Sequence, residues 1–152
     1  MFTSLYGSRS LRFDVTARES KQTAKIGWEN KLNGYMSSPV LVGKHVYLHL
    51  ENQRVACLDS RTGKQAWLTT KTFGKYWSMV VNGNRILALD QDGTLYLLAA
   101  NPTRFELLDK YRISETESWA HLAVVGDLLY IRELEAMAVY QWRQPAPAGK
   151  DK

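Results

Sequence analysis

The stretch Val40-Leu41-Val42-Gly43-Lys44-His45-Val46-Tyr47-Leu48 places two short apolar runs on either side of a glycine. Glycine adopts a positive φ without steric cost, so this pattern predicts two antiparallel strands joined by a tight turn. The same pattern returns around Gly83 and Gly126, at intervals of about 40 residues. The sequence is therefore an internal repeat whose unit begins with a β-hairpin.

Each repeat continues with further runs that are typical of strands. A third apolar run follows each hairpin, at residues 55–58, 95–98 and 137–140, and a fourth follows in two of the repeats, at 65–68 and 105–108. Four strands in about 40 residues are typical of one blade of a β-propeller. No long segment shows helical periodicity, so we expect an all-β fold.

The two ends of the chain contain incomplete repeats. Residues 1–5, 11–15 and 26–29 predict three strands of an earlier blade, and the last repeat ends after Trp142 without a fourth strand. We therefore expect a partial β-propeller of four-stranded antiparallel blades, two of them complete and two incomplete. Such an array does not close a ring of the usual blade number. We expect the blades that complete the ring to be the remaining blades of a longer chain, of which this is the C-terminal part, or those of a second copy of this chain.

These observations also predict the limits of the blades. The propeller unit covers residues 1–143, with blades at 1–32 (partial), 33–72, 73–113 and 114–143 (partial). Residues 144–152 are rich in Pro, Ala, Gly and Lys and show no apolar periodicity, which predicts a disordered tail.

One turn, Asp59-Ser60-Arg61-Thr62-Gly63-Lys64-Gln65-Ala66-Trp67, has the form D-x-x-T-G-x-x-x-W. Asp59 and Thr62 can hydrogen-bond the backbone of a tight turn, and Gly63 supplies a left-handed residue. Trp67 then lies at the start of the outer strand, where its flat ring can dock against the neighbouring blade. Trp28 stands about one repeat length earlier and is expected to have the same structural role.

This motif resembles the tryptophan-docking turn of the PQQ-like, BamB-like family of quinoprotein-type β-propeller repeats. The resemblance extends from about Met1 to Trp142, although the full motif occurs once; in the next copy residues 100–105 replace it, with Phe105 near the tryptophan position. It implies a location in the cell envelope, the periplasm or outside the cell. The chain itself has no signal-peptide pattern at its N-terminus.

The loops that join one blade to the next are polar and aromatic. Met36, Tyr76 and Trp119 each lie seven residues before a hairpin glycine, so we expect them to cluster where the inner strands begin, at one mouth of the channel. Exposed aromatic side chains at a propeller rim suit a protein or peptide partner, while packing between blades is the alternative. The candidate partner-contact residues are Met36, Lys75, Tyr76, Trp77, Trp119 and His121.

The resemblance also implies an alternative function, because the family includes PQQ- and calcium-dependent quinoprotein dehydrogenases. Such enzymes hold the quinone beneath a vicinal disulfide, which the single cysteine, Cys57, cannot form. The candidate acids lie beside turns, where solvated carboxylates are expected: Asp90, Asp92, Glu133 and Glu135. We therefore favour a non-catalytic scaffold or protein-interaction module, with no catalytic residue, cofactor or metal predicted, and keep the dehydrogenase fragment as the alternative.

The charge pattern indicates no other class of partner. The formal net charge of +5 comes from scattered residues without a basic block, so no specific nucleic-acid partner is predicted. His45 and His49 would lie about 13 Å apart along a strand, too far to share one metal ion. No apolar run reaches the roughly 18 residues of a membrane-spanning helix.

Overall fold

The computed structural model describes residues 2–4, 8–119 and 121–142, and every regular element in them is a β-strand. The strands form four antiparallel sheets, numbered here in chain order. Sheet one contains β1 (Phe2–Ser4), β2 (Ser10–Arg18) and β3 (Lys21–Asn30). Sheet two contains β4 (Val40–Val42), β5 (His45–His49), β6 (Val55–Asp59) and β7 (Gln65–Leu68).

Sheets three and four follow the same plan. Sheet three contains β8 (Trp77–Asn82), β9 (Arg85–Asp90), β10 (Thr94–Ala99) and β11 (Glu106–Arg112). Sheet four contains β12 (Ala123–Val125), β13 (Leu128–Arg132) and β14 (Met137–Gln141). Within these described ranges, no helix is long and apolar enough to cross a membrane.

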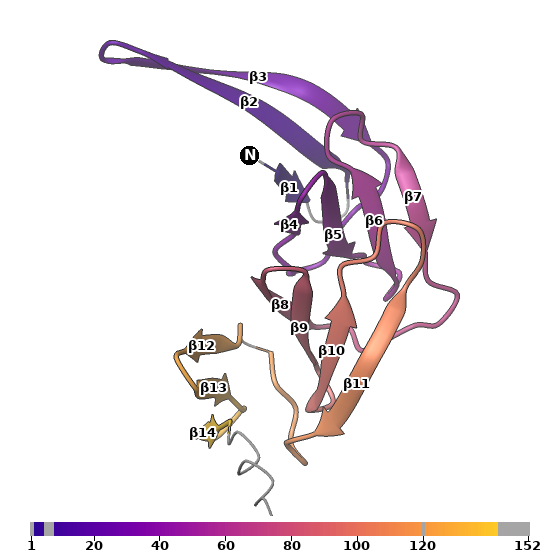
Figure 1. Ribbon diagram of the computed structural model, residues 1–152, viewed down its shortest axis with the longest axis vertical. Helices are drawn as coiled ribbons and strands as arrows, with labels where there is room; N and C mark the ends of the chain where they lie inside the picture. The colour runs from indigo at the N-terminus through magenta and orange to yellow at the C-terminus, as the bar shows by residue number, and fades with distance from the viewer. Residues whose placement is uncertain (1, 5–7, 120, 143–152) are drawn as a thin grey trace, which may run out of the picture.

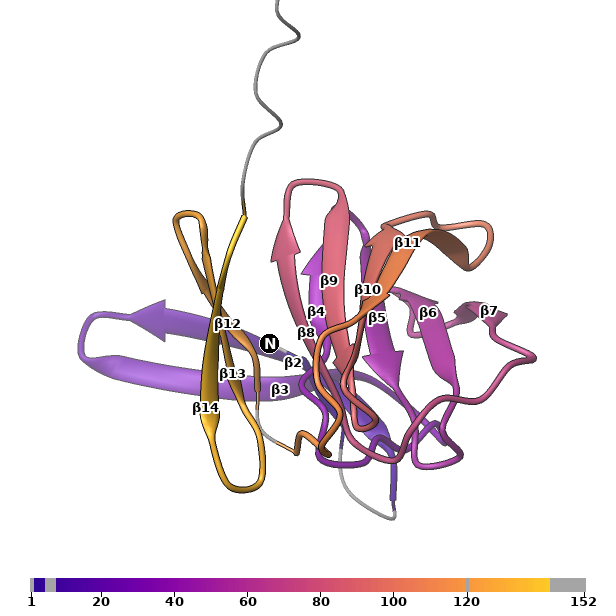
Figure 2. The ribbon, with the colours of Figure 1, turned by 90° about the horizontal axis from the view of Figure 1, so that it is seen from below.

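The four sheets fan out around a hollow, as the two ribbon views show (Figures 1 and 2). Each sheet is a meander with its strands in chain order, and the sheets have three, four, four and three strands. The first strands of sheets two to four, β4, β8 and β12, lie nearest the hollow on the left of Figure 1. This arrangement confirms the predicted partial propeller with two complete and two incomplete blades.

The predicted hairpin glycines occupy the turns that open the last three sheets. Gly43, Gly83 and Gly126 have φ values of 57°, 57° and 61°, a left-handed conformation that costs other residues free energy. They join β4 to β5, β8 to β9 and β12 to β13. The repeat spacing in the sequence is therefore the spacing of these turns.

Apolar side chains fill each of the three interfaces between neighbouring sheets. The interface of sheets two and three holds the rings of Tyr47, Phe73, Trp77 and Tyr96. Sheets one and two meet at Leu48, Leu50, Ala56 and Leu58, with Trp28 packed against them. Sheets three and four meet at Leu89, Leu95, Leu122, Leu129 and Ile131. Each sheet thus buries its faces only by packing on its neighbours, as repeat architectures do.

Cys57 lies in the interface of sheets two and three and is fully buried. Burial raises the pKa of its thiol to about 11, so the thiol is protonated and unreactive at neutral pH. Cys57 is thus a small residue of the core.

Sheet one contains a feature that the sequence pattern does not predict. The strands expected at residues 11–15 and 26–29 are parts of much longer strands, and residues 13–26 form a hairpin arm that projects from the fan (Figure 1). Residues 14–25 of this arm are all exposed. The arm lacks a run of apolar residues, which is why the sequence pattern shows only its base. The tail predicted at residues 144–152 lies outside the described residues.

Two titratable side chains, His49 and Asp90, are buried near the interface of sheets two and three. Burial lowers the pKa of His49 to about 4. The Oδ1 atom of Asp90 accepts hydrogen bonds from the backbone N–H groups of Gly74 and Gln91, each at 2.7 Å. Burial nevertheless raises the pKa of Asp90 to about 6, and the charge of Asp92 acts in the same direction.

These two shifts predict opposite pH dependences of stability. The raised pKa of Asp90 contributes stability at low pH that is lost as the pH rises from about 4 to 6. The lowered pKa of His49 contributes stability above about pH 6.5 that is lost as the pH falls towards 4. The quantity to compare is the change in unfolding free energy when the pH is raised from about 4.5 to 7. Relative to the wild type, this change should be about 2 kcal/mol more positive for Asp90→Asn and about 2 kcal/mol less positive for His49→Phe.

Urea unfolding of the wild type and both variants at these two pH values measures the difference. The two variants should depart from the wild type in opposite directions. Identical pH dependences in all three proteins would contradict the assignment of these buried groups.

Candidate interaction site on an aromatic rim

The turn at residues 59–63 is closed by its own side chains. The Oδ1 atom of Asp59 accepts hydrogen bonds from the N–H and the hydroxyl of Thr62, each at 2.7 Å, and from the N–H of Arg61 at 3.1 Å. The bonds from Thr62 hold the pKa of Asp59 below its usual range. Gly63 follows with a φ of 71°. Asp59, Thr62 and Gly63 therefore make the turn that their spacing predicts.

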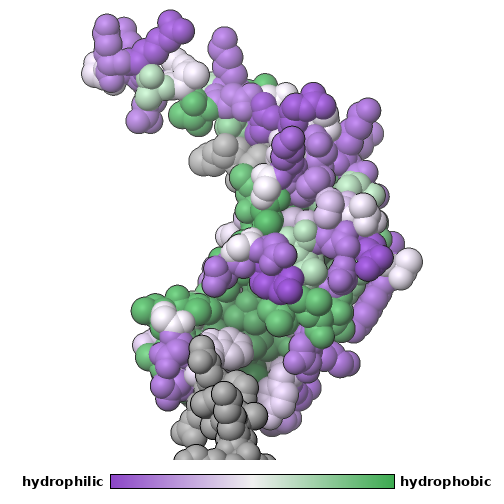
Figure 3. All heavy atoms as spheres, viewed as in Figure 1, coloured by the Kyte–Doolittle hydropathy of each residue, from purple (hydrophilic) through white to green (hydrophobic). Residues whose placement is uncertain are grey.

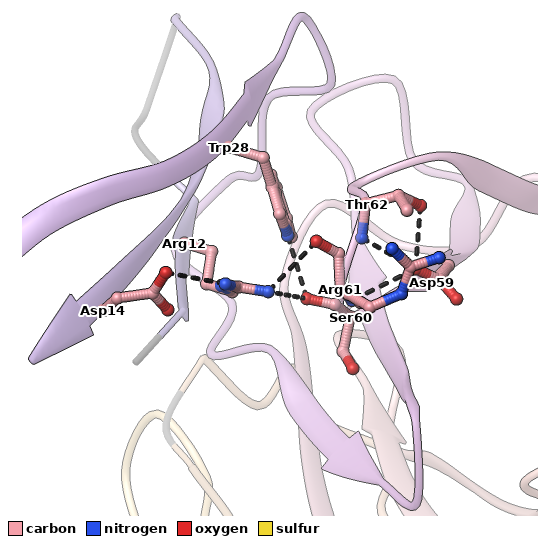
Figure 4. Close-up of polar contacts among 7 residues, drawn as sticks. All are labelled: Arg12, Asp14, Trp28, Asp59, Ser60, Arg61 and Thr62. Carbon is pink, nitrogen blue, oxygen red and sulfur yellow. Dashed lines mark hydrogen bonds and ion pairs between the residues drawn. The ribbon is translucent and has the colours of Figure 1, made fainter.

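The indole of Trp28 lies on this turn and joins sheet one to sheet two (Figure 4). Its Nε1–H donates to the carbonyl oxygen of Ser60 at 2.9 Å. The ring covers Gly63 so closely that an added Cβ would lie 2.6 Å from the indole Cδ2 atom. Beside the indole, Arg12 donates to the carbonyl oxygens of Ser60 and Arg61, at 3.1 and 3.0 Å. A tryptophan of one sheet thus docks on the turn of the next.

Trp67 repeats this contact between sheets two and three. Its Nε1–H donates to the carbonyl oxygen of Asn101 at 2.9 Å. The Oδ1 atom of Asn101 accepts from the N–H and hydroxyl of Thr103, each at 2.8 Å, as Asp59 does with Thr62. The ring of Phe105 meets Trp67 edge-on, with centroids 6.1 Å apart. The second docking turn therefore exists without the D-x-x-T-G pattern, which is why the sequence motif shows only one.

A row of aromatic side chains crosses three successive sheets near the starts of their first strands. The rings of Tyr76 and Trp119 stack with centroids 4.9 Å apart and planes at 24°. The ring of Tyr35 lies 5.5 Å from that of Tyr76, and the ammonium group of Lys75 lies 4.8 Å from the Tyr35 centroid. With Met36, these four residues form what we call the aromatic rim.

The rim combines exposed and anchored side chains. Trp119 is 53% exposed and Met36 is 67% exposed, whereas Tyr35 is 7% exposed. The indole N–H of Trp119 donates to Glu117 at 2.9 Å. The rim thus presents apolar surface to solvent on a buried tyrosine base.

The backbone corner at Asp90 and Gln91 holds two of the three loops that carry the rim, those of Tyr76 and Trp119. Asp90 accepts from the Gly74 N–H, as described above, and the Gln91 side-chain oxygen accepts from the Lys75 N–H at 3.0 Å. The carbonyl oxygen of Gln91 accepts from the Ser118 N–H at 2.9 Å. Tyr76 and Trp119 each lie one residue beyond these bonds, so the corner fixes the positions of their rings.

The structure places most of the predicted contact residues together. Met36, Tyr76, Trp119 and His121 line one small recess, and Lys75 is exposed beside it. Tyr35, rather than Met36, packs on Tyr76. Met36 has a φ of 34°, a turn conformation that breaks the register expected for its position.

Trp77, another residue of the predicted contact set, lines the same recess but is the most deeply buried of them. It is 2% exposed and lies in the core between sheets two and three. Its indole stacks on His49 with centroids 5.6 Å apart, and Phe73 and Tyr96 pack against it. Trp77 begins β8, where side chains alternate between faces, so its ring points inward while the ring of Tyr76 lies on the rim. Trp77 therefore supports the rim from below.

Sequence reasoning also missed residues that build the site. Tyr35, Glu117 and the Asp90–Gln91 corner contribute to the rim, but none of them belongs to a motif. Their common signal is position: Tyr35 and Glu117 lie within two residues of predicted rim residues. The corner follows β9, where no sequence rule predicts a contact with the preceding loop.

Two of the four candidate acids, Asp90 and Asp92, accept hydrogen bonds from backbone N–H groups. The carboxylate of Asp90 receives two backbone N–H groups, and Asp92 accepts from the Thr94 N–H at 2.9 Å. Glu135 is exposed. In the part of the chain that the structure describes, no group of three or more His, Cys, Asp or Glu side chains is placed to hold a metal ion.

The fan of sheets and the docking of indoles on turns define a partial β-propeller. Residues 3–69 match the family model described as "Outer membrane protein assembly factor BamB". This match confirms the BamB-like resemblance that the docking motif predicts.

Solved structures share this fold at low sequence identity. BamB from Moraxella catarrhalis is 13% identical with a TM-score of 0.70, over 96% of this chain and 42% of that one. The β-propeller domain of Cps50 (Swd1) from Myceliophteria thermophila is 12% identical with a TM-score of 0.64, over 92% and 51%. A europium-containing methanol dehydrogenase is 18% identical with a TM-score of 0.50, over 68% and 22%.

This chain therefore spans about half of each of the first two structures or less. A comparison with curated proteins finds no match.

Because the Trp28 ring lies so close to Gly63, replacing this glycine should destabilise the protein more than replacing a glycine that only has a positive φ. Gly63→Ala should destabilise the protein by about 2–4 kcal/mol, because the new methyl group strains the backbone and displaces the Trp28 ring. Gly43→Ala is the matched control, since Gly43 has a similar φ but no atom near an added Cβ, and it should cost about 1 kcal/mol. Urea unfolding measures both; equal losses would argue against the docking of Trp28 on this turn.

The docking of Trp67 predicts that replacing it lowers the unfolding free energy, and that a smaller aromatic residue lowers it less than alanine does. Trp67→Ala should destabilise by about 3 kcal/mol, because it removes a half-buried ring and leaves the Asn101 carbonyl without its donor. Trp67→Phe keeps the ring contacts and should lose about 1–2 kcal/mol. Chemical denaturation is the measurement, and a loss below about 1 kcal/mol for Trp67→Ala would contradict a docking role.

Proposed function

We propose that this chain is a non-catalytic propeller module that binds a protein or an extended peptide through the aromatic rim. The observation that carries the proposal is the stack of Trp119 on Tyr76, in which Trp119 stays half exposed while Tyr76 packs in turn on the buried Tyr35. Tryptophan, tyrosine and methionine are enriched where protein interfaces are strongest. The rim presents all three types on one continuous surface.

The way in which the rim is held favours binding over simple packing. The Asp90–Gln91 corner fixes the loops that carry Tyr76 and Trp119 through hydrogen bonds to their backbone. A surface that is already ordered loses little conformational entropy on binding, which raises affinity. Lys75 and Glu117 flank the aromatic rings with opposite charges, an arrangement that can orient a partner.

The similarity to BamB supports a location in the cell envelope for the proposed module. The family model that matches residues 3–69 is described as an outer membrane assembly factor, and we extend that location to this chain as part of the proposal. The alternative function is that of a fragment of a PQQ- and calcium-dependent quinoprotein dehydrogenase. Quinone absorbance and calcium-dependent dye reduction measured on the protein would detect that activity.

Photo-crosslinking in cells tests the interaction. A photoreactive phenylalanine analogue at Met36 should crosslink one discrete protein, and the same analogue at Leu108 on the outer strand β11 should not. Trp119→Ala should reduce the Met36 crosslink at least about tenfold. Trp142→Ala is the matched control, since Trp142 is 47% exposed, and it should leave the crosslink unchanged.

Two results would contradict the proposed function. One is equal crosslinking from Met36 and Leu108, which would indicate non-specific contact. The other is an equal effect of Trp119→Ala and Trp142→Ala, which would show that the rim has no special role.

A further inference from the structure

The arm of sheet one, residues 13–26, gathers charged side chains on one of its faces. In the space-filling view the arm reaches away from the body of the fan at the upper left and is mostly hydrophilic (Figure 3). Residues that oppose each other in a two-stranded ribbon share a face. The strand register puts three pairs on the charged face: Asp14 with Lys25, Thr16 with Thr23, and Arg18 with Lys21.

The charged face lies on the side of sheet two. Arg12 precedes Asp14 by two positions on the same face and donates to the carbonyl oxygens of Ser60 and Arg61, at 3.1 and 3.0 Å (Figure 4). The face is therefore continuous with the side of sheet one that packs on its neighbour. It then extends beyond that neighbour, where residues 14–25 are all exposed.

The cations of this face present their charge to solvent. Within the described ranges of the chain, the ion pairs include none of Arg18, Lys21 and Lys25. Asp14 lies opposite Lys25, but its carboxylate is bound to the guanidinium group of Arg12 at 2.6 Å. The face thus carries three cations with no bound acid between the Asp14 pair and the tip.

Two features at the tip of the arm cost folding free energy. Arg18 and Lys21 face each other directly across the two strands, and like charges in that position are destabilising. Glu19, in the turn between them, has a φ of 52°, a left-handed conformation that is uncommon for a residue other than glycine. Such unfavourable features concentrate at functional sites. An anion placed between Arg18 and Lys21 would replace their repulsion with two attractions.

We propose that this charged face binds an extended acidic segment of a partner protein. Lys21 and Lys25 lie four residues apart on β3, which is about 13 Å along a strand. Carboxylates four residues apart on an extended peptide have the same separation, so two of them can meet both lysines at once. Arg18 stands about 5 Å across the arm from Lys21 and can share the first of these carboxylates.

The threonine pair between the lysines suits the same partner. The hydroxyl groups of Thr16 and Thr23 lie 2.8 Å apart, at hydrogen-bond distance. When one hydroxyl donates to the other, the hydrogen of the accepting hydroxyl is left to donate elsewhere. A carboxylate at the position between the other two would accept it. The face therefore matches an acidic residue at every second position of an extended chain.

This surface is separate from the aromatic rim, and none of its residues belongs to the rim. The proposal therefore goes beyond the proposed function and does not depend on it. Trp119→Ala should leave binding at the arm unchanged, so the two proposals can fail separately.

Fluorescence anisotropy of a labelled decapeptide in which Glu alternates with Thr tests the proposal on the whole chain. The dissociation constant should be about 1 mM or lower at about 50 mM NaCl. It should rise at least about threefold at about 300 mM NaCl, because salt screens exposed ion pairs. The same peptide with Gln in place of every Glu should not bind.

Substitutions on the arm locate the contact. Arg18→Gln combined with Lys21→Gln should raise the dissociation constant about tenfold, while Glu19→Gln should lower it about twofold by removing an acid from the tip. Lys110→Gln is the matched control, since Lys110 is an exposed lysine on the outer strand β11, and it should leave binding unchanged. All four positions are exposed, and circular dichroism confirms that each variant folds.

Three outcomes would overturn the proposal. No binding of the acidic peptide up to about 1 mM would show that these charges only keep an edge strand from pairing with other chains. Equal effects of Lys110→Gln and of the double arm variant would show that the contact is not on the arm. Tighter, arm-dependent binding of a single-stranded oligonucleotide, or of phosphatidylcholine vesicles containing phosphatidylglycerol, would assign the arm to a nucleic acid or to a membrane surface instead.

Discussion

The docking of an indole on the turn of the next sheet is the contact on which the rest of this structure depends. Apolar packing between sheet faces is strong but has no directional preference. The N–H groups of Trp28 and Trp67 add direction, because each bonds one backbone carbonyl in the neighbouring sheet. The two indoles therefore fix the orientation of sheet one on sheet two and of sheet two on sheet three, while apolar side chains alone pack sheet four on sheet three.

The aromatic rim is a consequence of the same repetition. Residues at equivalent repeat positions converge in space when neighbouring sheets are related by the same rotation, which is why Tyr76 stacks on Trp119. The pairing of loops through Asp90 and Gln91 holds this convergence in place. The surface that we propose for binding is thus built from neighbouring positions of successive repeats.

Several features followed from local sequence patterns, while others depended on contacts across the fold. Gly43, Gly83 and Gly126 predict their turns because positive φ is a property of one residue. The turn around Asn101 could not be predicted, because its role depends on where Trp67 reaches. The sequence also did not predict which of Tyr76 and Trp77 points into the core. Adjacent residues of a strand face opposite sides, and the side that becomes buried is the one on which sheet two packs. The long arm was predicted only at its base, because its apolar residues alternate with polar ones and form no continuous apolar run.

By itself, the sequence determined the repeat, the order of the strands and the docking turn at residues 59–63, because each depends on conformational preferences within a few residues. The tertiary structure alone decided which side chains meet: Trp28 with Gly63, Tyr35 with Tyr76, and Asp90 with the loop at Gly74. These outcomes depend on the angle between sheets, which arises only when several blades pack together.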